Sequence, residues 1–419
     1  MDDKTAHRDL DHHSAEFARD HREIYRDARA RCPVLHSDAH GGFHVLTRFA
    51  DVRAALRNSA ALSAGRFRDE EGNLQGGVAI PPNGMRIGII EMDPPEGTAL
   101  RALLRPWFSR SAVEARTDRI AELARWVIDG VIAHGRCDAV TDIAMPMPLL
   151  LVMDILGLPL DRALNYGSAV LEAVAKKPGS LKGMHWLVAD LNDTIERGGY
   201  HGAGLVAALL RAEIDGERLP RDLVVELVMM LLFGGGDTTI SAICSLMLHL
   251  SRNPADRAGL IEDESLLPRA IEEILRLHSP STGVARTVVE PVEIAGVAFS
   301  PGDRVICAVN SANLDEATFK DADRFDLNRP SNPHLSFGSG LHACLGQNLA
   351  RADIRVLMTE ILRRMPDFEI DLDAVEPYGS IPMVYGFNAM PMRFSSGKPS
   401  APTRPAEPVL TTPRFVPAD

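Results

Sequence analysis

The segment that most restricts the possible folds of this chain lies near its C-terminal end, where residues 337–351 read FGSGLHACLGQNLAR. Cys344 stands where a glycine-punctuated loop passes into a helix. Gly338 and Gly340 permit backbone angles that other residues avoid. A helix N-terminus supplies unpaired N–H groups and partial positive charge, and both stabilise a thiolate. The segment is therefore suited to hold a cysteine thiolate against a metal.

Two further residues of this segment favour a ligand role for its cysteine. Gly346 removes a side chain where the helix would lie close to something flat, and Phe337 can cover the sulfur and keep water away. The alternative is that Cys344 is only a small buried apolar residue, as free cysteines often are. The spacing Phe-x-x-Gly-x-His-x-Cys-x-Gly argues against it, because chance agreement at six spaced positions is improbable.

This spacing resembles the haem-ligand loop of the cytochrome P450 family. The resemblance implies haem b (iron protoporphyrin IX) with the thiolate of Cys344 as axial iron ligand, which favours O–O cleavage. It also implies a mainly α fold with small β-sheets (α+β), forming a triangular single large helical domain. The likeness covers residues from about 15 to 394, and its specific motifs lie between residues 233 and 351.

A second unusual feature is a run of three glycines, residues 234–236, inside an expected helix over residues 223–250. Each interior glycine costs about 0.8–1 kcal/mol relative to alanine, so three cost on the order of 2–3 kcal/mol. We therefore expect that something approaches the helix backbone closely, or that the hydrogen-bond ladder opens. The alternative is a glycine kink in which Asp237 and Thr238 compete for backbone hydrogen bonds.

The glycine run and the two residues after it resemble the distal helix of the same family. The resemblance implies that Thr238 offers its hydroxyl to iron-bound O₂ and that Asp237 relays protons from solvent. It further implies that the glycines, Gly235 among them, leave room for the porphyrin and for O₂. Members of the family that use hydrogen peroxide often lack the acid–threonine pair, so its presence favours O₂ and external electrons.

Haem carries two propionates, which need cationic or polar partners. By resemblance to the family, the candidates are His342, Arg286 and Arg101. Many relatives have a histidine four residues before the last of these, where this chain has Gly97, so one propionate contact is missing or replaced. A further family element is Glu273-x-x-Arg276 with Arg329, which we interpret as structural and not catalytic.

Composition restricts the remaining possibilities. The chain has 419 residues, enough for one large domain or two ordinary ones, and its net charge of −12 disfavours nucleic acid as a partner. Five cysteines are scattered with no Cys-x-x-Cys, so neither a zinc site nor a disulfide framework is indicated, and a reducing cytosol fits best.

No membrane attachment is expected. The N-terminus lacks an apolar signal region, and the most apolar stretches, residues 143–153 and 223–233, are too short for a bilayer, which needs about 20 apolar residues. We therefore expect a soluble, cytoplasmic protein of the bacterial type.

Periodicity predicts the main elements of the chain. Helices are expected over residues 15–31, 111–134, 205–213, 220–251, 268–278 and 345–364, a hairpin over 33–47, and strands and turns over 287–306. The expected organisation is a flexible N-terminus (1–14), the haem-thiolate monooxygenase domain (15–394) and a proline-rich disordered tail (395–419).

The predicted activity is insertion of one oxygen atom from O₂ into a small organic substrate. The chain is too short for an added reductase and has no Gly-x-Gly-x-x-Gly fingerprint, so a separate ferredoxin and ferredoxin reductase are implied. An acidic ferredoxin would need a basic patch, for which the candidates are Arg101, Arg105, Arg110, Arg351 and Arg355.

Two other functions are compatible with parts of the sequence. A haem-based gas sensor would also need the cysteine loop, but it would have no use for the acid–threonine pair. A metal-free helical binding protein is the second. The substrate stays open between a small apolar or aromatic molecule and a larger biosynthetic intermediate.

Overall fold

The computed structural model describes residues 5–7, 10–174 and 180–400. The chain divides into two compact units, each built from separate stretches of sequence. Unit 1 comprises Met1–Arg101, Glu272–Leu345 and Tyr378–Tyr385, and unit 2 comprises Ala102–Ile271, Gly346–Pro377 and Gly386–Asp419. The predicted boundaries at residues 14 and 394 stay predictions, and most of the predicted tail (401–419) lies outside the described residues.

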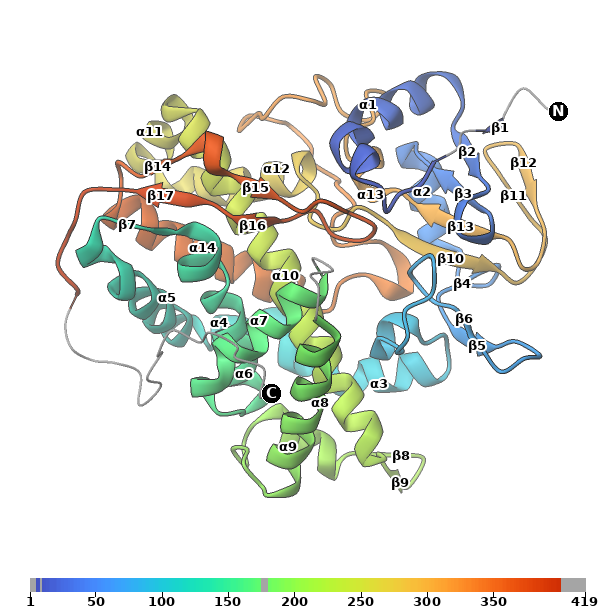
Figure 1. Cartoon of the computed structure of the whole chain (residues 1–419), viewed down its shortest axis with the longest axis horizontal. Helices are drawn as coiled ribbons and strands as arrows, with labels where there is room; N and C mark the ends of the chain where they lie inside the picture. Colours follow the sequence, from blue (N-terminus) through green and yellow to red (C-terminus); the bar gives the residue numbers. More distant parts are fainter. Residues whose placement is uncertain (1–4, 8–9, 175–179, 401–419) are drawn as a thin grey trace. The chain divides into compact units, whose positions relative to one another are not determined.

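Helices dominate the chain and the sheets are small (Figure 1), which confirms the predicted mainly α class. The α-helices are α1 (Ala15–Arg31), α2 (Phe49–Arg57), α3 (Glu96–Leu104), α4 (Arg110–Glu114), α5 (Thr117–Val131), α6 (Pro146–Leu156), α7 (Ala163–Val174), α8 (Ser180–Glu196), α9 (Leu205–Arg211), α10 (Arg221–Arg252), α11 (Pro254–Glu262), α12 (Leu267–Leu277), α13 (Val309–Ala312) and α14 (Gln347–Arg364).

The strands are short and fall into several sheets. They are β1 (Thr5–His7), β2 (Val34–Ser37), β3 (Phe43–Leu46), β4 (Leu62–Ser63), β5 (Arg66–Arg68), β6 (Leu74–Gly76), β7 (Arg136–Asp138), β8 (Glu213–Ile214), β9 (Glu217–Arg218), β10 (Val284–Val288), β11 (Val292–Ile294), β12 (Val297–Phe299), β13 (Arg304–Cys307), β14 (Glu369–Ile370), β15 (Glu376–Pro377), β16 (Phe387–Ala389) and β17 (Pro391–Arg393).

Unit 1 is organised around a six-stranded sheet with the order β1-β2-β3-β13-β10-β4. The pair β2–β3 is antiparallel, with Val34 opposite Leu46, which confirms the predicted hairpin. Strand β13 runs parallel to β3 and antiparallel to β10, so the first and last strands of the predicted 287–306 stretch join the hairpin sheet. Strands β11 and β12 between them form a separate two-stranded sheet. Leu46, Val305 and Phe319 belong to the apolar cluster that this sheet buries.

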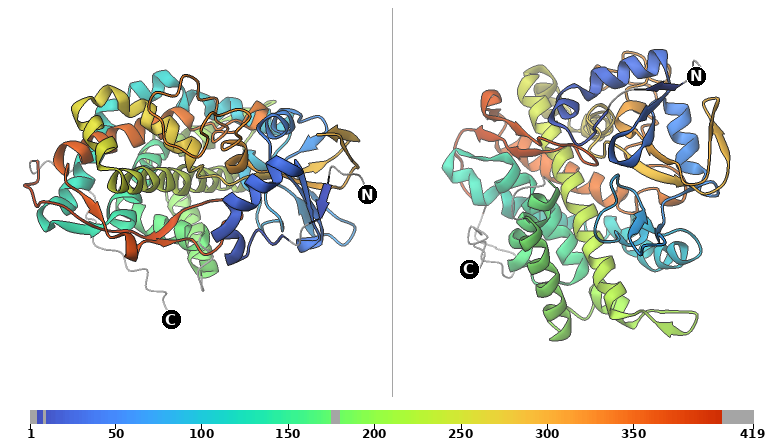
Figure 2. Two further views of the ribbon diagram at one scale, coloured as in Figure 1. Left: turned by 90° about the horizontal axis from the view of Figure 1, so that it is seen from above. Right: turned by 45° about the vertical axis from the view of Figure 1, so that its right-hand side comes forward.

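Unit 2 is built around the 32-residue helix α10, which runs as one unbroken helix (Figure 2). Helices α6 and α7 pack against it, and α14 packs against α5. A three-stranded sheet of order β14-β17-β7 completes this unit. Most side chains along α10 are buried, because the helix is apolar over nearly its whole circumference.

Helix boundaries from periodicity agree closely in most places. The prediction over 15–31 matches α1, and α10 and α12 begin and end within one residue of their predictions. The single helix predicted over 111–134 was wrong. Arg116 leaves helical geometry at φ −100° and ψ 5°, so the stretch divides into α4 and α5, with a short 3₁₀ turn after α5.

The described residues include two segments long and apolar enough to cross a membrane by composition, Ala139–Leu156 and Arg221–Arg252. The prediction that these regions are too short was therefore wrong. In the structure 83% of the most apolar window of the first and 61% of that of the second are buried against the rest of the chain. Burial of this extent is typical of the core helices of water-soluble proteins.

Candidate functional site

The cysteine loop forms a closed turn in unit 1. The backbone N–H of Cys344 donates to the carbonyl of Phe337 at 2.7 Å, and α14 begins three residues later with Gly346 as its N-cap. Gly338 has φ 69° and Gly340 has φ 77°, which confirms that the turn uses angles that favour glycine. A Cβ on Gly340 would also lie 2.8 Å from the carbonyl oxygen of Leu56.

Cys344 differs from the core cysteines in its surroundings. Cys244 and Cys307 are buried, and burial raises the pKa of the Cys307 thiol to about 11, although the nearby Arg286 opposes this. These thiols stay protonated and act as small apolar groups. Cys344 is partly exposed at the end of a loop, directly before a helix N-terminus, which is the environment that a thiolate ligand requires.

Arg101 lies beside the cysteine loop. Its guanidinium donates to the carbonyl oxygen of Ala343, the residue before Cys344. Four residues earlier, a Cβ on Gly97 would lie too close to the carbonyl oxygen of Met92. The backbone therefore leaves no room for a side chain at this position, where many family members have a histidine.

Arg286 is a buried cation on β10 with an exposed fraction of only 3%. Its guanidinium donates to the carbonyl of the adjacent Ala285 at 2.8 Å, and no ion pair within 4 Å joins it to any residue that the structure describes. Burial lowers its pKa, while Cys307 and Asp93 act in the opposite direction. Because a buried charge is costly without a counterion, this site is suited to a carboxylate from a bound group.

His342 offers a second polar group at the same loop. Its Nε2 is buried and has no hydrogen-bond partner among the described residues, and it lies 3.8 Å from Oδ1 of Asp93. Burial tends to raise the pKa of Asp93, but the nearby His342, the Ser63 hydroxyl and the Ala64 amide outweigh it and lower the pKa to about 2. Asp93 is therefore ionised and holds part of the charge of this region.

Sequence reasoning gave Asp93 no role. The sequence did contain a signal, because Asp93 is an acidic residue in the segment around Arg101 that was expected to bind the haem propionates. The structure adds Asp93 to this region, with its Oδ1 3.8 Å from Nε2 of His342 and no direct hydrogen bond between the two.

These residues fit a haem. The buried arginine without a counterion and the unpartnered nitrogen of His342 suit two propionates, and the partly exposed cysteine suits the iron. A Cβ on Gly346 would meet no atom within 4 Å among the described residues, so the helix N-terminus leaves open space there. Phe337 contacts His334 at a ring separation of 5.9 Å, and its predicted role of covering the sulfur stays a prediction.

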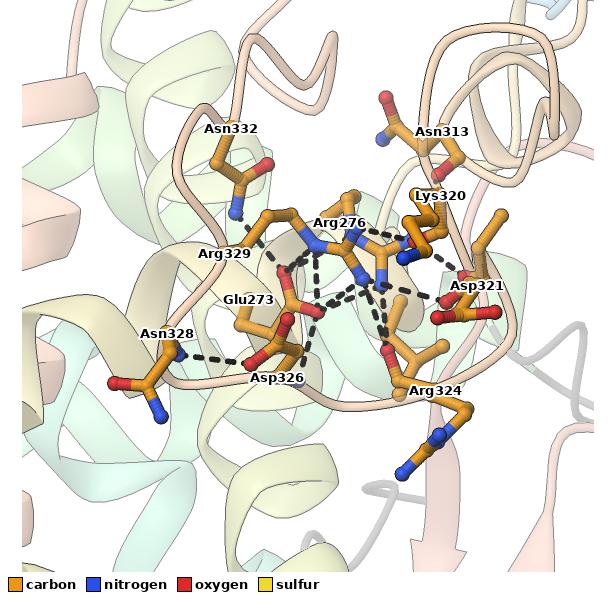
Figure 3. Close-up of polar contacts among 12 residues, drawn as sticks. Glu273, Arg276, Asn313, Lys320, Asp321, Arg324, Asp326, Asn328, Arg329 and Asn332 are labelled. Atoms are coloured by element: carbon orange, nitrogen blue, oxygen red, sulfur yellow. Dashed lines mark hydrogen bonds and ion pairs between the residues drawn. The ribbon is translucent and has the colours of Figure 1, made fainter.

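The predicted element of Glu273, Arg276 and Arg329 forms a buried network in unit 1 (Figure 3). The carboxylate of Glu273 accepts from Nε and Nη2 of Arg276 at 3.0 and 2.8 Å, and from Nε of Arg329 at 3.0 Å. Arg276 is fully buried and also donates to the backbone carbonyls of Asn313, Ala322 and Arg324. The network ties α12 to the irregular segment that precedes the cysteine loop.

The glycine run of α10 lies in unit 2 and does not break the helix. A Cβ on Gly235 would lie 2.6 Å from Cγ2 of Val152, and one on Gly236 would lie 3.3 Å from Cδ2 of Leu149. Both neighbours are on α6, so the expected close approach to the backbone is that of a packed helix. A Cβ on Gly234, in contrast, would meet no described atom within 4 Å.

The acid–threonine pair follows this run on α10. Thr238 donates its hydroxyl to the carbonyl of Gly234 at 3.1 Å, one turn earlier. Asp237 is buried, with an exposed fraction of 2%. The roles of Gly235, Asp237 and Thr238 in cofactor and oxygen chemistry stay predictions.

Comparison with known proteins identifies the family. The family model for cytochrome P450 matches residues 256–378. A steroid C26-monooxygenase from Mycolicibacterium smegmatis is 33% identical over 91% of this chain and 94% of its own length. The P450 monooxygenase PikC from Streptomyces venezuelae is 31% identical over 82% of this chain and 84% of its own length. The chain belongs to the cytochrome P450 family.

Solved structures agree with this assignment. The P450 CYP109Q5 from Chondromyces apiculatus is similar with a TM-score of 0.80 and 27% identity, covering 94% of this chain and 99% of that one. A mutant of P450 EryK in complex with erythromycin B is similar with a TM-score of 0.81 and 28% identity, covering 93% and 99%. The protein is thus a haem b-dependent P450 monooxygenase that oxidises an organic substrate with O₂.

Proposed function

We propose that Cys344 is the axial ligand of this monooxygenase and that Arg286, His342 and Arg101 hold the haem propionates. The observation that carries this proposal is the buried guanidinium of Arg286, which has no ion pair within the described part of the chain. When bound, the haem supplies the binding and activation of O₂. The residues of the chain supply the sulfur ligand of the iron, the polar and cationic partners of the propionates, and the protons.

Asp237 and Thr238 are proposed to deliver protons during oxygen activation. A threonine hydroxyl is both donor and acceptor and rotates freely about its C–O bond. Thr238 can therefore exchange its bond to the Gly234 carbonyl, 3.1 Å long, for a bond to a polar group outside the helix. Asp237, the adjacent carboxyl, is the group that replaces the proton that Thr238 gives up.

The proposed substrate is a bulky, largely apolar molecule. Support comes from the names of relatives, which include steroid C26-monooxygenases and a mycinamicin IV hydroxylase/epoxidase. Titration of the ferric protein with steroids, macrolides and small terpenoids tests this proposal through the Soret shift that accompanies loss of iron-bound water. Shifts with small terpenoids alone would contradict it.

A separate ferredoxin and its reductase are the proposed electron donors, acting in the cytoplasm. Exposed arginines of unit 2, at Arg105, Arg110 and Arg355, are the proposed docking cations, and Arg110 already pairs with Glu114 at 2.9 Å. The change Arg355→Glu should raise the KM for an acidic ferredoxin several-fold while leaving the CO spectrum unchanged. An unchanged KM in both Arg105→Glu and Arg355→Glu would remove this face as the docking surface.

Two substitutions test the site itself. Cys344→His should abolish the red-shifted Soret band of the reduced CO complex, whereas Cys137→Ser, at another partly exposed cysteine, should retain it. Thr238→Ala should divert electrons into peroxide, measured as product formed per NADH consumed, whereas Thr239→Ala on the same helix should keep normal coupling. Equal coupling in the two threonine variants would refute the proton-delivery role of Thr238.

A further inference from the structure

Three histidines meet in unit 1 at a place that the proposed haem site does not use. His12 and His13 come directly before α1, and His40 lies in η1 (Ala39–Gly41), the short 3₁₀ turn between β2 and β3. One ring nitrogen of each lies within 4.8 Å of those of the other two. The ring centroids are separated by 4.4 Å (His12–His13), 4.8 Å (His13–His40) and 5.4 Å (His12–His40).

Hydrogen bonds fix which ring nitrogen carries the proton in two of these histidines. Nε2 of His40 lies 2.7 Å from Oδ1 of Asp11, and Nε2 of His13 lies 2.7 Å from the carbonyl oxygen of Ile80. Carboxylate and carbonyl oxygens only accept, so each Nε2 carries its proton, and the lone pair of each neutral ring is on Nδ1. Metal-binding histidines are oriented in this way, by donating the second N–H to a carboxylate or a backbone carbonyl.

The third ring is buried. His12 has an exposed fraction of 4%, and its Nδ1 has no hydrogen-bond partner among the residues described. A buried polar atom without a partner is costly, and a cation would satisfy it.

The backbone around the cluster holds these rings together. His40 adopts a left-handed conformation, φ 53° and ψ 30°, which is uncommon for a residue other than glycine. Oδ1 of Asp11 accepts from the backbone N–H of His13 at 2.8 Å as well as from His40. One carboxylate therefore links the segment before α1 to the turn between β2 and β3.

We propose that His12, His13 and His40 bind one Zn²⁺, with Asp11 as the carboxylate that orients His40. Tetrahedral Zn²⁺ with imidazole nitrogens at 2.0–2.1 Å needs these nitrogens about 3.3 Å apart. One ring nitrogen of each residue now lies within 4.8 Å of those of the other two, so the rings must rotate to bring their nitrogens to this spacing. The ion clamps the N-terminal segment to the β2–β3 turn. The competing possibility is a set of neutral histidines packed edge-on against Phe43, whose ring centroid is 5.0 Å from that of His12.

Zinc binding to the untagged, haem-loaded protein tests this proposal. After treatment with a chelator and dialysis against Zn²⁺, metal analysis should give one zinc per chain. His40→Gln should weaken zinc binding at least tenfold, and Asp11→Asn should weaken it about 10–100-fold. His201→Gln, at an exposed histidine of unit 2, is the matched control and should bind zinc normally.

Two further readouts separate this proposal from the proposed function. X-ray absorption at the zinc edge should show imidazole ligands at 2.0–2.1 Å. The Soret band of the reduced CO complex should be the same in every variant, since none of these residues belongs to the haem site. Less than stoichiometric zinc, or equal affinity in His40→Gln and the parent protein, would overturn the zinc site and leave the haem assignment untouched.

Discussion

Replacing Glu273 by glutamine removes one charge from the centre of a buried network. The side chain is 1% exposed, and it neutralises Arg276, which is fully buried, and Arg329, whose side chain is 6% exposed. Glutamine has the same size, but its amide group adds two donors where the neighbours already donate. Arg276 would keep its bonds to three backbone carbonyls, and it would share the one remaining side-chain acceptor, the amide oxygen, with Arg329.

Removing one partner of a buried ion pair costs about 3–5 kcal/mol, because the remaining charge stays buried without compensation. Two guanidinium groups lose their counterion here, so the upper part of this range is expected for Glu273→Gln. A loss of this size is a large share of the 5–15 kcal/mol that stabilises a typical native protein. Part of the variant should therefore be unfolded at growth temperature.

Urea unfolding followed by far-UV circular dichroism measures this loss as a lower midpoint at an unchanged slope. Glu114→Gln is the matched control, because Glu114 pairs with Arg110 at 63% and 86% side-chain exposure. An exposed pair of this kind contributes about 0–1 kcal/mol. If Glu273→Gln lost no more stability than Glu114→Gln, the network would not stabilise the fold and the reasoning would be refuted.

Three further predictions concern single positions. Burial raises the pKa of Asp353 from 3.8 to about 8, so between these pH values the native chain keeps a proton that the unfolded chain releases. The free energy of unfolding should therefore fall as pH rises through this interval. Asp353→Asn should abolish this pH dependence in urea titrations at pH 5 and pH 8. Gly235→Ala should destabilise the fold by about 1–3 kcal/mol, because the new methyl group overlaps with Val152. Gly234→Ala, which meets no such neighbour in the described part of the chain, should stabilise the fold by up to about 1 kcal/mol. Equal urea midpoints for the two variants would contradict the packing of α6 on α10. Arg286→Leu should stabilise the haem-free protein, because it removes a buried charge that has no counterion among the described residues. The same variant should release haem to an acceptor protein about tenfold faster, since a charge-assisted hydrogen bond contributes about 1.5–3 kcal/mol. An unchanged rate of haem release would remove Arg286 from the propionate site.

Local sequence signals predicted much of the fold because they act over short distances. The helical period gave α1 and α10 to within one residue, and the glycines at 41 and 42 indicated the hairpin turn. Helix α6 was missed because it is apolar on all sides and so has no amphipathic period. The division of residues 111–134 into α4 and α5 was missed because nothing in the local pattern required Arg116 to leave helical geometry.

Sequence motifs predicted which residues form the candidate site, but they did not predict how these residues pack. The cysteine loop and the Glu273 network follow from spacing, whereas Asp93 and the contact of Gly235 with Val152 depend on residues far apart in the chain. The histidine cluster shows the same limit. His40 is 27 residues from His13, and only the fold brings them together. Residue spacing along the chain gives no indication of such a cluster.

The segmented construction of unit 1 has a consequence for biosynthesis. Its three stretches end at residues 101, 345 and 385, so no truncation from either end yields this unit alone. Its sheet pairs β3 with β13 across more than 250 positions of sequence. That pairing can form only after β13 has been synthesised and has left the ribosome. The cysteine loop is synthesised later still, so loading of the prosthetic group has to wait for both.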